Sequence, residues 1–137
     1  MSISNEAKDG SGAFHWSVQD NDGRQRMIGP VGDPTKASIS IAASGDNSVI
    51  AAPGVGNKIR ILGLWAQNTD AASTTVILKD NATAINGAGW VIVTNGFLPI
   101  IATPLTPLDL GNNAPFVINL SAAHQLSGIV VYTVEAV

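Results

Sequence analysis

Charge is scarce in the second half of this sequence. Between Asn81 and Val134 the only charged side chain is Asp109, in a stretch dense in Val, Ile, Leu, Thr, Asn and Gly. A free soluble domain normally covers its surface with Lys, Glu, Arg and Asp, which are almost never buried unpaired. The scarcity predicts that other protein covers these strands, or that their exterior consists of uncharged Ser, Thr and Asn. Both alternatives favour a subunit of an assembly over an enzyme.

Other features are missing from the whole chain. There is no cysteine, which excludes a disulfide framework and a thiolate metal site. The net charge is −3 and no run of Lys or Arg occurs, which argues against a nucleic-acid partner. No apolar run approaches the ~18 residues of a membrane span, and the N-terminus lacks the pattern of a classical signal peptide. We therefore expect a soluble protein with neither nucleic acid nor a membrane as its partner.

The charges that are present divide the chain into two parts. Its 137 residues suit one domain; they carry seven basic and ten acidic side chains, nine of which lie in residues 1–36. The composition changes near residues 29–34, a segment rich in Gly and Pro. The sequence predicts an extended N-terminal arm over residues 1–36, with one weak hairpin across residues 13–28, and a β-domain over residues 37–137.

Large apolar side chains form two clusters in the otherwise polar arm. They fold back and cap an edge of the β-domain, or they anchor the arm on a neighbouring subunit, because aromatic residues are favoured in interface cores. The sequence leaves both alternatives open. The candidate contact residues of the arm are Phe14, His15, Trp16, Met27 and Ile28.

From residue 37 onward, short runs rich in Val, Ile and Thr alternate with turn residues at roughly ten-residue spacing. This pattern is typical of an antiparallel β-sandwich or barrel, and no segment shows a convincing helical period. The expected strands are 38–43, 48–52, 58–67, 73–79, 82–85, 90–94, 105–110, 116–121 and 129–135.

Several of these strands are apolar on both faces. Alternation puts Ile59 and Ile61 on one face of the 58–67 strand, yet the opposite face still carries Leu62 and Leu64. One sandwich core cannot use both faces, so either a loop or the arm covers the second face, or it is a subunit interface. The second alternative predicts self-association. The candidate residues for it are Trp65, Trp90, Ile92, Val130 and Tyr132.

Three segments carry a resemblance to a known family: residues 49–64, with their Pro53-Gly54-Val55-Gly56 turn, residues 119–123 and residues 126–132. Together they resemble small capsid cement, or decoration, proteins of tailed bacteriophages. The resemblance implies a jelly-roll-like β-sandwich that is often trimeric and binds the major capsid protein or another virion protein. It also implies assembly in the host cytoplasm, a place on the capsid surface, and an arm that holds the shell.

Reaction chemistry finds no support in the residues. The two histidines, His15 and His124, lie far apart, and their spacing matches no metal motif. The nucleophile motif G-x-S-x-G does not occur, and the glycine-rich segments are not followed by a helix that could bind phosphate. We expect no catalytic residue, metal or cofactor. Two hypotheses follow: a capsid cement subunit, or a carbohydrate- or receptor-binding module of a phage tail or head fibre in which Trp65 or Trp90 stacks on sugar rings.

Overall fold

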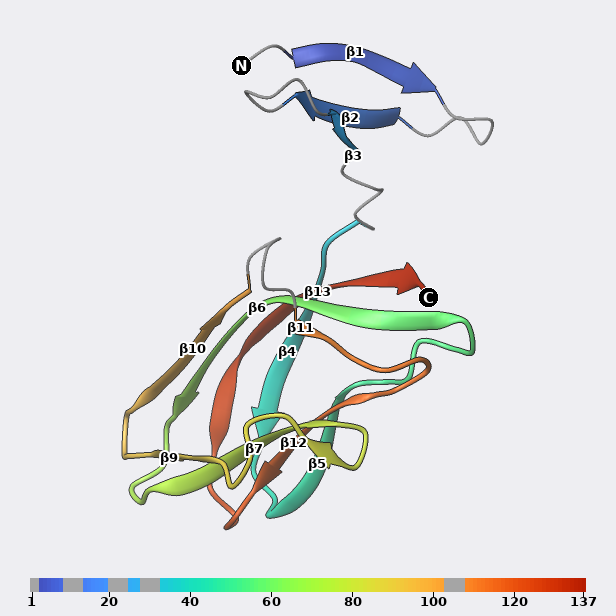
Figure 1. Ribbon diagram of the computed structural model, residues 1–137. Helices are drawn as coiled ribbons and strands as arrows, with labels where there is room; N and C mark the ends of the chain where they lie inside the picture. Colours follow the sequence, from blue (N-terminus) through green and yellow to red (C-terminus); the bar gives the residue numbers. More distant parts are fainter. Residues whose placement is uncertain (1–2, 9–13, 20–24, 28–32, 103–107) are drawn as a thin grey trace. The chain divides into compact units, whose positions relative to one another are not determined.

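The chain forms two compact units, residues 1–32 and residues 33–137. The computed structural model describes residues 3–8, 14–19, 25–27, 33–102 and 108–137 (Figure 1). The first unit contains a three-stranded antiparallel sheet with the order β1-β2-β3. Its strands are Ile3–Lys8 (β1), Phe14–Gln19 (β2) and Gln25–Met27 (β3).

The hairpin expected across residues 13–28 corresponds to β2 and β3. These strands pair antiparallel, with Ser17 opposite Met27 and Gln19 opposite Gln25. Strand β1, which pairs with β2, was not predicted, because its only apolar side chains, Ile3 and Ala7, are too few for a clear alternation.

The described residues of the second unit form ten strands in two antiparallel sheets that pack together. One sheet has the order β10-β6-β13-β4, with β11 also paired to β6; the other has the order β5-β12-β7-β8, with β9 also paired to β7. The strands are Thr35–Ile41 (β4), Gly45–Ile50 (β5), Asn57–Asn68 (β6), Thr74–Asp80 (β7), Thr83–Ala84 (β8), Trp90–Ile92 (β9), Phe97–Ile101 (β10), Leu108–Asp109 (β11), Phe116–Leu120 (β12) and Leu126–Ala136 (β13).

The order of pairing is nested. Strand β4 pairs with β13, β5 with β12, β6 with β10 and β7 with β9, so that the chain alternates between the two sheets. This nesting is the double Greek key of a jelly roll. The prediction of an all-β, jelly-roll-like antiparallel sandwich is therefore confirmed. Among the described residues, none lies in a helix capable of crossing a bilayer.

The core lies between the two sheets and is formed mainly by the inward faces of β6, β7, β12 and β13. Phe116, Ile118 and Leu120 on β12 are at most 1 % exposed. The other sheet contributes Ile59 and Ile61 from β6, both fully buried, as alternation predicted. The remaining core residues are Ile39, Ile41, Ile50, Leu64, Ala66, Val76, Leu78, Ile92, Leu98, Leu110, Ala114, Leu126 and Val130.

A β-bulge in β6 explains why that strand reads as apolar on both faces. Two consecutive residues of β13 pair with Gly63 and Ile61, which leaves Leu62 as the extra residue on β6. The bulge reverses the alternation, so Ile61 and Leu64 both face the core. The expectation that Leu64 lies on the face opposite Ile61 is therefore wrong, since that expectation assumed unbroken alternation.

Eight of the expected strands of the body match β4–β9, β12 and β13 to within a few residues. Of the expected strand 105–110, the structure shows Leu108–Asp109 as β11, and residues 103–107 lie outside the described part. Strand β10 was not predicted, because Pro99 at its centre argues against a strand. Strand β4 begins at Thr35, two residues before the boundary expected from the charges.

Candidate association surface

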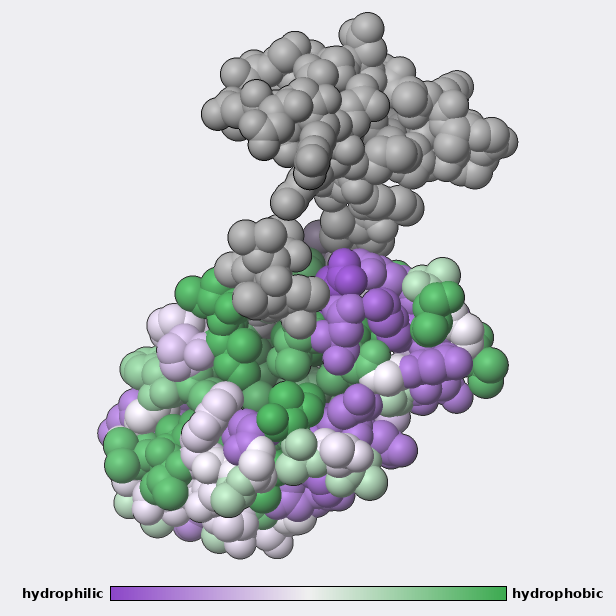
Figure 2. Space-filling view, in the orientation of Figure 1, coloured by the Kyte–Doolittle hydropathy of each residue, from purple (hydrophilic) through white to green (hydrophobic). Residues whose placement is uncertain are grey.

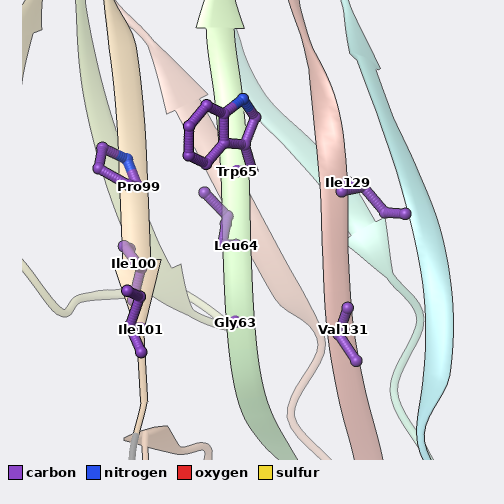
Figure 3. A pocket seen from close by; sticks show the side chains of 8 residues that line it. All are labelled: Gly63, Leu64, Trp65, Pro99, Ile100, Ile101, Ile129 and Val131. Atoms are coloured by element: carbon purple, nitrogen blue, oxygen red, sulfur yellow. The ribbon is translucent and has the colours of Figure 1, made fainter.

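The outer face of the β10-β6-β13-β4 sheet is apolar where β6 runs from the bulge to its C-terminal end. The backbone pairing brings residues of β10, β6 and β13 side by side, and Figure 3 shows the same arrangement with the β6 residues in the middle. We call this surface the apolar face. Its first row is Phe97 on β10, its second row is Pro99, Trp65 and Ile129, and its third row is Ile101, Gly63 and Val131.

The side chains of the apolar face are open to solvent to an unusual degree. Trp65 and Phe97 are each 53 % exposed, Ile101 is 85 % exposed and Ile129 is 40 % exposed. Figure 2 shows hydrophobic residues gathered on the side of the body where Figure 1 places β10. A single exposed apolar side chain is ordinary, but a contiguous group marks an association or binding site.

The two aromatic side chains of the face contact each other. The ring centroids of Trp65 and Phe97 lie 5.3 Å apart, with an angle of 54° between the ring planes. Phe97 pairs with Gln67 across the strands, so it is a diagonal neighbour of Trp65, a position from which aromatic rings reach each other. Because each ring restricts the other, both lose little freedom when a partner covers them.

A shallow groove of about 250 Å³ runs over the apolar face. Gly63 lines this groove and lies between Ile101 and Val131 in its row (Figure 3); we call the space left by its missing side chain the hollow. Among the lining residues that the structure describes, the indole N–H of Trp65 is the only hydrogen-bonding group of a side chain. The groove therefore suits apolar contact far better than the binding of a polar ligand.

On the N-terminal side of the bulge, the same face of β6 is charged. Lys58 Nζ lies 2.7 Å from a carboxylate oxygen of Asp109 on β11, and Arg60 Nε lies 2.6 Å from the other. Arg60 also lies 3.1 Å from the Glu135 carboxylate on β13. The hydrogen bond from Arg60, assisted by one from Lys58, lowers the pKa of Asp109 to about 2. This charged quartet joins β11 and β13 to β6 and carries no net charge.

The pKa of Asp109 predicts how stability changes in acid. A carboxylate whose folded pKa lies below its unfolded value stabilises the fold above the unfolded pKa, and this contribution is lost as the pH falls from about 4 to 2. We expect Asp109→Asn to lower the free energy of unfolding by about 1–2 kcal/mol at pH 7, since partial exposure weakens the pair. The difference from the wild type should shrink toward pH 2, measured by urea unfolding across pH.

The control for this prediction is Asp46→Asn. Asp46 pairs with Lys79 at 2.7 Å, but half of its side chain is exposed, so the change should be smaller. An equal loss for the two variants, or a difference for Asp109→Asn that is independent of pH, would contradict the role of the quartet.

The structure separates the residues expected for self-association. Trp65 lies on the apolar face, whereas Trp90 is 44 % exposed on β9, in the other sheet. Ile92 and Val130 are 5 % and 0 % exposed and belong to the core. They point inward on strands whose neighbouring residues point outward, so they are not surface contacts. Tyr132 is partly buried and packs against the core.

The residues expected to form contacts from the arm lie in the first unit. Phe14, His15 and Trp16 are on β2 and Met27 is on β3, while Ile28 lies outside the described residues. Their contact role stays a prediction.

Of the seven residues of the apolar face, only Trp65 was among the candidates expected from the sequence; the three residues that β10 contributes, Phe97, Pro99 and Ile101, were missed together with their strand. A signal was present, because Phe97, Pro99 and Ile101 alternate with Leu98 and Ile100, and the latter two face inward. The apolar character of both sets hid the alternation, and Pro99 disguised the strand.

A polar cluster around Asp70 connects two loops of the body. The Asp70 carboxylate accepts hydrogen bonds from the backbone N–H groups of Gln125 and Ala71, which lower its pKa, and lies 3.3 Å from His124 Nδ1. It thereby links the loops after β6 and β12. Within the described parts of the chain, no group of three or more metal-ligating side chains comes together.

Comparisons of the chain with protein-family models, with curated proteins and with solved structures found no match. The residues and the geometry of this chain are therefore the basis for its proposed function.

Proposed function

We propose that this chain is a non-enzymatic structural protein, a cement or decoration subunit of a tailed-bacteriophage capsid. The observation that supports this best is the apolar face, an exposed contiguous surface on a rigid sheet with a groove that is almost free of polar groups. A soluble protein rarely leaves such a surface open unless another protein covers it. The scarcity of charge after residue 81 also supports a surface that another protein covers.

The proposed mode of action is stabilisation by binding. A subunit that contacts two neighbouring shell proteins binds only the assembled shell, so it stabilises that state by mass action. The two units of the chain suit two contacts: the apolar face of the body for other subunits, and the N-terminal unit with Phe14, His15, Trp16, Met27 and Ile28 for the major capsid protein. The site of action in this proposal is the capsid surface.

The segments that carry the resemblance to phage cement proteins lie close to the apolar face in the fold. Residues 49–64 run from the end of β5 through the turn at residues 53–56 into β6, residues 119–123 run from the end of β12 into the following loop, and residues 126–132 belong to β13. They include the centre of the sheet that carries the apolar face. The jelly-roll topology also agrees with the fold that the resemblance implies.

A second candidate function is carbohydrate binding, because Trp65 offers an exposed ring beside a groove. Stacking alone does not identify a sugar, whose hydroxyl groups need several polar partners to be bound specifically. The groove provides one side-chain donor, the indole N–H. We therefore place this function second.

Binding to capsids tests the first function against the second. The purified chain is expected to cosediment in a saturable manner with empty capsids of the phage that encodes it, and to raise the temperature at which they dissociate. Titration with glycans, followed by the fluorescence of tryptophan, is the comparison. Saturable glycan binding that disappears in Trp65→Ala, without any binding to capsids, would replace the structural function by the carbohydrate-binding function.

A further inference from the structure

We infer that a second copy of this chain covers the apolar face in a two-fold contact, in which Ile101 of each copy enters the hollow over Gly63 of the other. This inference rests on the proposed function and names the partner of its main surface. It differs from the trimer that the resemblance implies, because a two-fold contact of one face with itself closes at two copies.

The apolar face is complementary to itself. Ile101 protrudes most, with 85 % of the residue exposed, and Gly63, which has no side chain to place in the groove, lies directly beside it in the same row (Figure 3). A projection and a hollow that are neighbours on one surface can be exchanged between two copies by a rotation of 180°. The exchange puts each Ile101 against Gly63, Trp65 and Val131 of the other copy.

The area of the face fits one side of a dimer interface. Trp65 and Phe97 together leave on the order of 200 Å² open, since an aromatic side chain can bury ~150–250 Å² and each is about half-exposed. With Pro99, Ile101 and Ile129 the apolar area reaches on the order of 400 Å², about half of the ~800 Å² that each partner of a standard interface contributes.

The surroundings of the face supply the other half. Polar residues border the apolar rows on the neighbouring positions of β6, β13 and β4, as the rim of an interface requires. The charged quartet on the far side of the bulge pairs two cations with two anions, so the approach of a second copy brings no net repulsion from it. The rim residues are Gln67, Ser127, Ser40, Ser38 and Lys36.

Pairing through the edge of β10 is the competing way for two copies to associate, and Pro99 disfavours it. Gly96 and Ala102, which flank β10, form backbone hydrogen bonds with β6, from Asn68 N to Gly96 O and from Ala102 N to Leu62 O. Along β10 the even-numbered residues therefore direct their backbone N–H and C=O groups toward β6. Phe97, Pro99 and Ile101 therefore direct their backbone groups to the edge that no described strand covers. Pro99 has no N–H, so the middle donor of that edge is missing.

Sedimentation velocity of the full chain over a range of concentrations tests the inference. We expect the wild type to be a dimer. We expect Ile101→Lys to raise the dissociation constant of the dimer on the order of 100-fold, because each of the two exchanged contacts contributes about tenfold or more to the affinity. Val55→Lys is the matched control: Val55 is 84 % exposed in the turn before β6, and its variant should dimerise like the wild type. Thermal unfolding checks that both variants are folded.

A mixing experiment tests the exchange itself. Gly63 tolerates a side chain, because an added Cβ meets only the carbonyl oxygen of Ile100 at 3.6 Å. Gly63→Asp and Ile101→Lys should each be monomeric when alone. In their mixture one contact pairs Asp with Lys and the other keeps the wild-type residues, so a heterodimer should form. Two monomers that stay separate after mixing would overturn the exchange.

The remaining outcomes separate the inference from the proposed function. A wild type that is monomeric at tens of micromolar, or that has the mass of three chains, would overturn the two-fold contact. If that monomer still binds capsids and Ile101→Lys does not, a shell protein covers the apolar face and the proposed function stands. If neither dimers nor binding to capsids is found, both fail.

Discussion

Replacing Phe116 by alanine is expected to lower the free energy of unfolding by about 3–5 kcal/mol, the range for truncating a buried Phe. Phe116 is 0 % exposed and pairs with Ile50 on β5 and Asp80 on β7, so it lies on the central strand of its sheet. The main chain on both sides is hydrogen-bonded and cannot collapse freely into the cavity. Since small domains have about 5–15 kcal/mol in total, this loss is a large share of the stability of the protein.

The matched control is Phe97→Ala, which removes the same side chain from the apolar face. Phe97 is 53 % exposed, and its loss should change the free energy of unfolding by less than about 1 kcal/mol when the protein is dilute enough for association to contribute nothing. Equilibrium unfolding in guanidinium chloride measures both variants. Similar losses for the two would mean that Phe116 is not part of a closely packed core.

Gly128→Ala is the second substitution with a large expected effect. Gly128 lies on β13 opposite Ala66, and a Cβ atom added there would clash with the carbonyl oxygen of Trp65 and lie 2.7 Å from the Cα atom of Ala66. These are backbone atoms, which cannot rotate away as a side chain can, so β6 and β13 must move apart. We expect a loss of about 1–3 kcal/mol or more, as for other overpacked sites.

Gly63→Ala provides the comparison on the partner strand, because its added Cβ meets nothing closer than 3.6 Å. Its effect on the midpoint of urea unfolding should stay within about 0.5 kcal/mol. If the two alanine variants unfold at the same urea concentration, the close approach of β6 and β13 at Gly128 is not a feature of the protein in solution.

The fold class could be predicted from the sequence because the strands are short, rich in Val, Ile and Thr, and separated by turn residues. Alternation puts Phe116, Ile118 and Leu120 on one face of the 116–121 segment, and these three residues lie in the core. It failed for Leu64, because the bulge that reverses the alternation of β6 depends on pairing with β13, which lies more than sixty residues away in the chain. Local patterns contain no information about such a partner.

The candidate site was predicted only in part. The excess of apolar side chains predicted an association surface, and Trp65, one of its candidates, is exposed on the apolar face. Ile92 and Val130 were assigned to it wrongly, since an apolar residue beside other apolar residues gives no sign of which face it occupies. Phe97 and Ile101 were missed because their strand contains Pro99, which a strand accepts only where its missing N–H would face away from its partner.

The bulge at Leu62 determines which side chains of β6 face outward on this surface. Arg60, before the bulge, and Trp65, after it, both point outward. In a strand with unbroken alternation, two residues five positions apart would lie on opposite faces. Deleting Leu62 would remove the bulge and keep both halves of the strand in phase, with Trp65 outward and Leu64 inward, whereas an unbroken strand of the present length would turn Trp65 inward and Leu64 outward. Spacing along β6, as much as the identity of its residues, therefore specifies which side chains other proteins can reach.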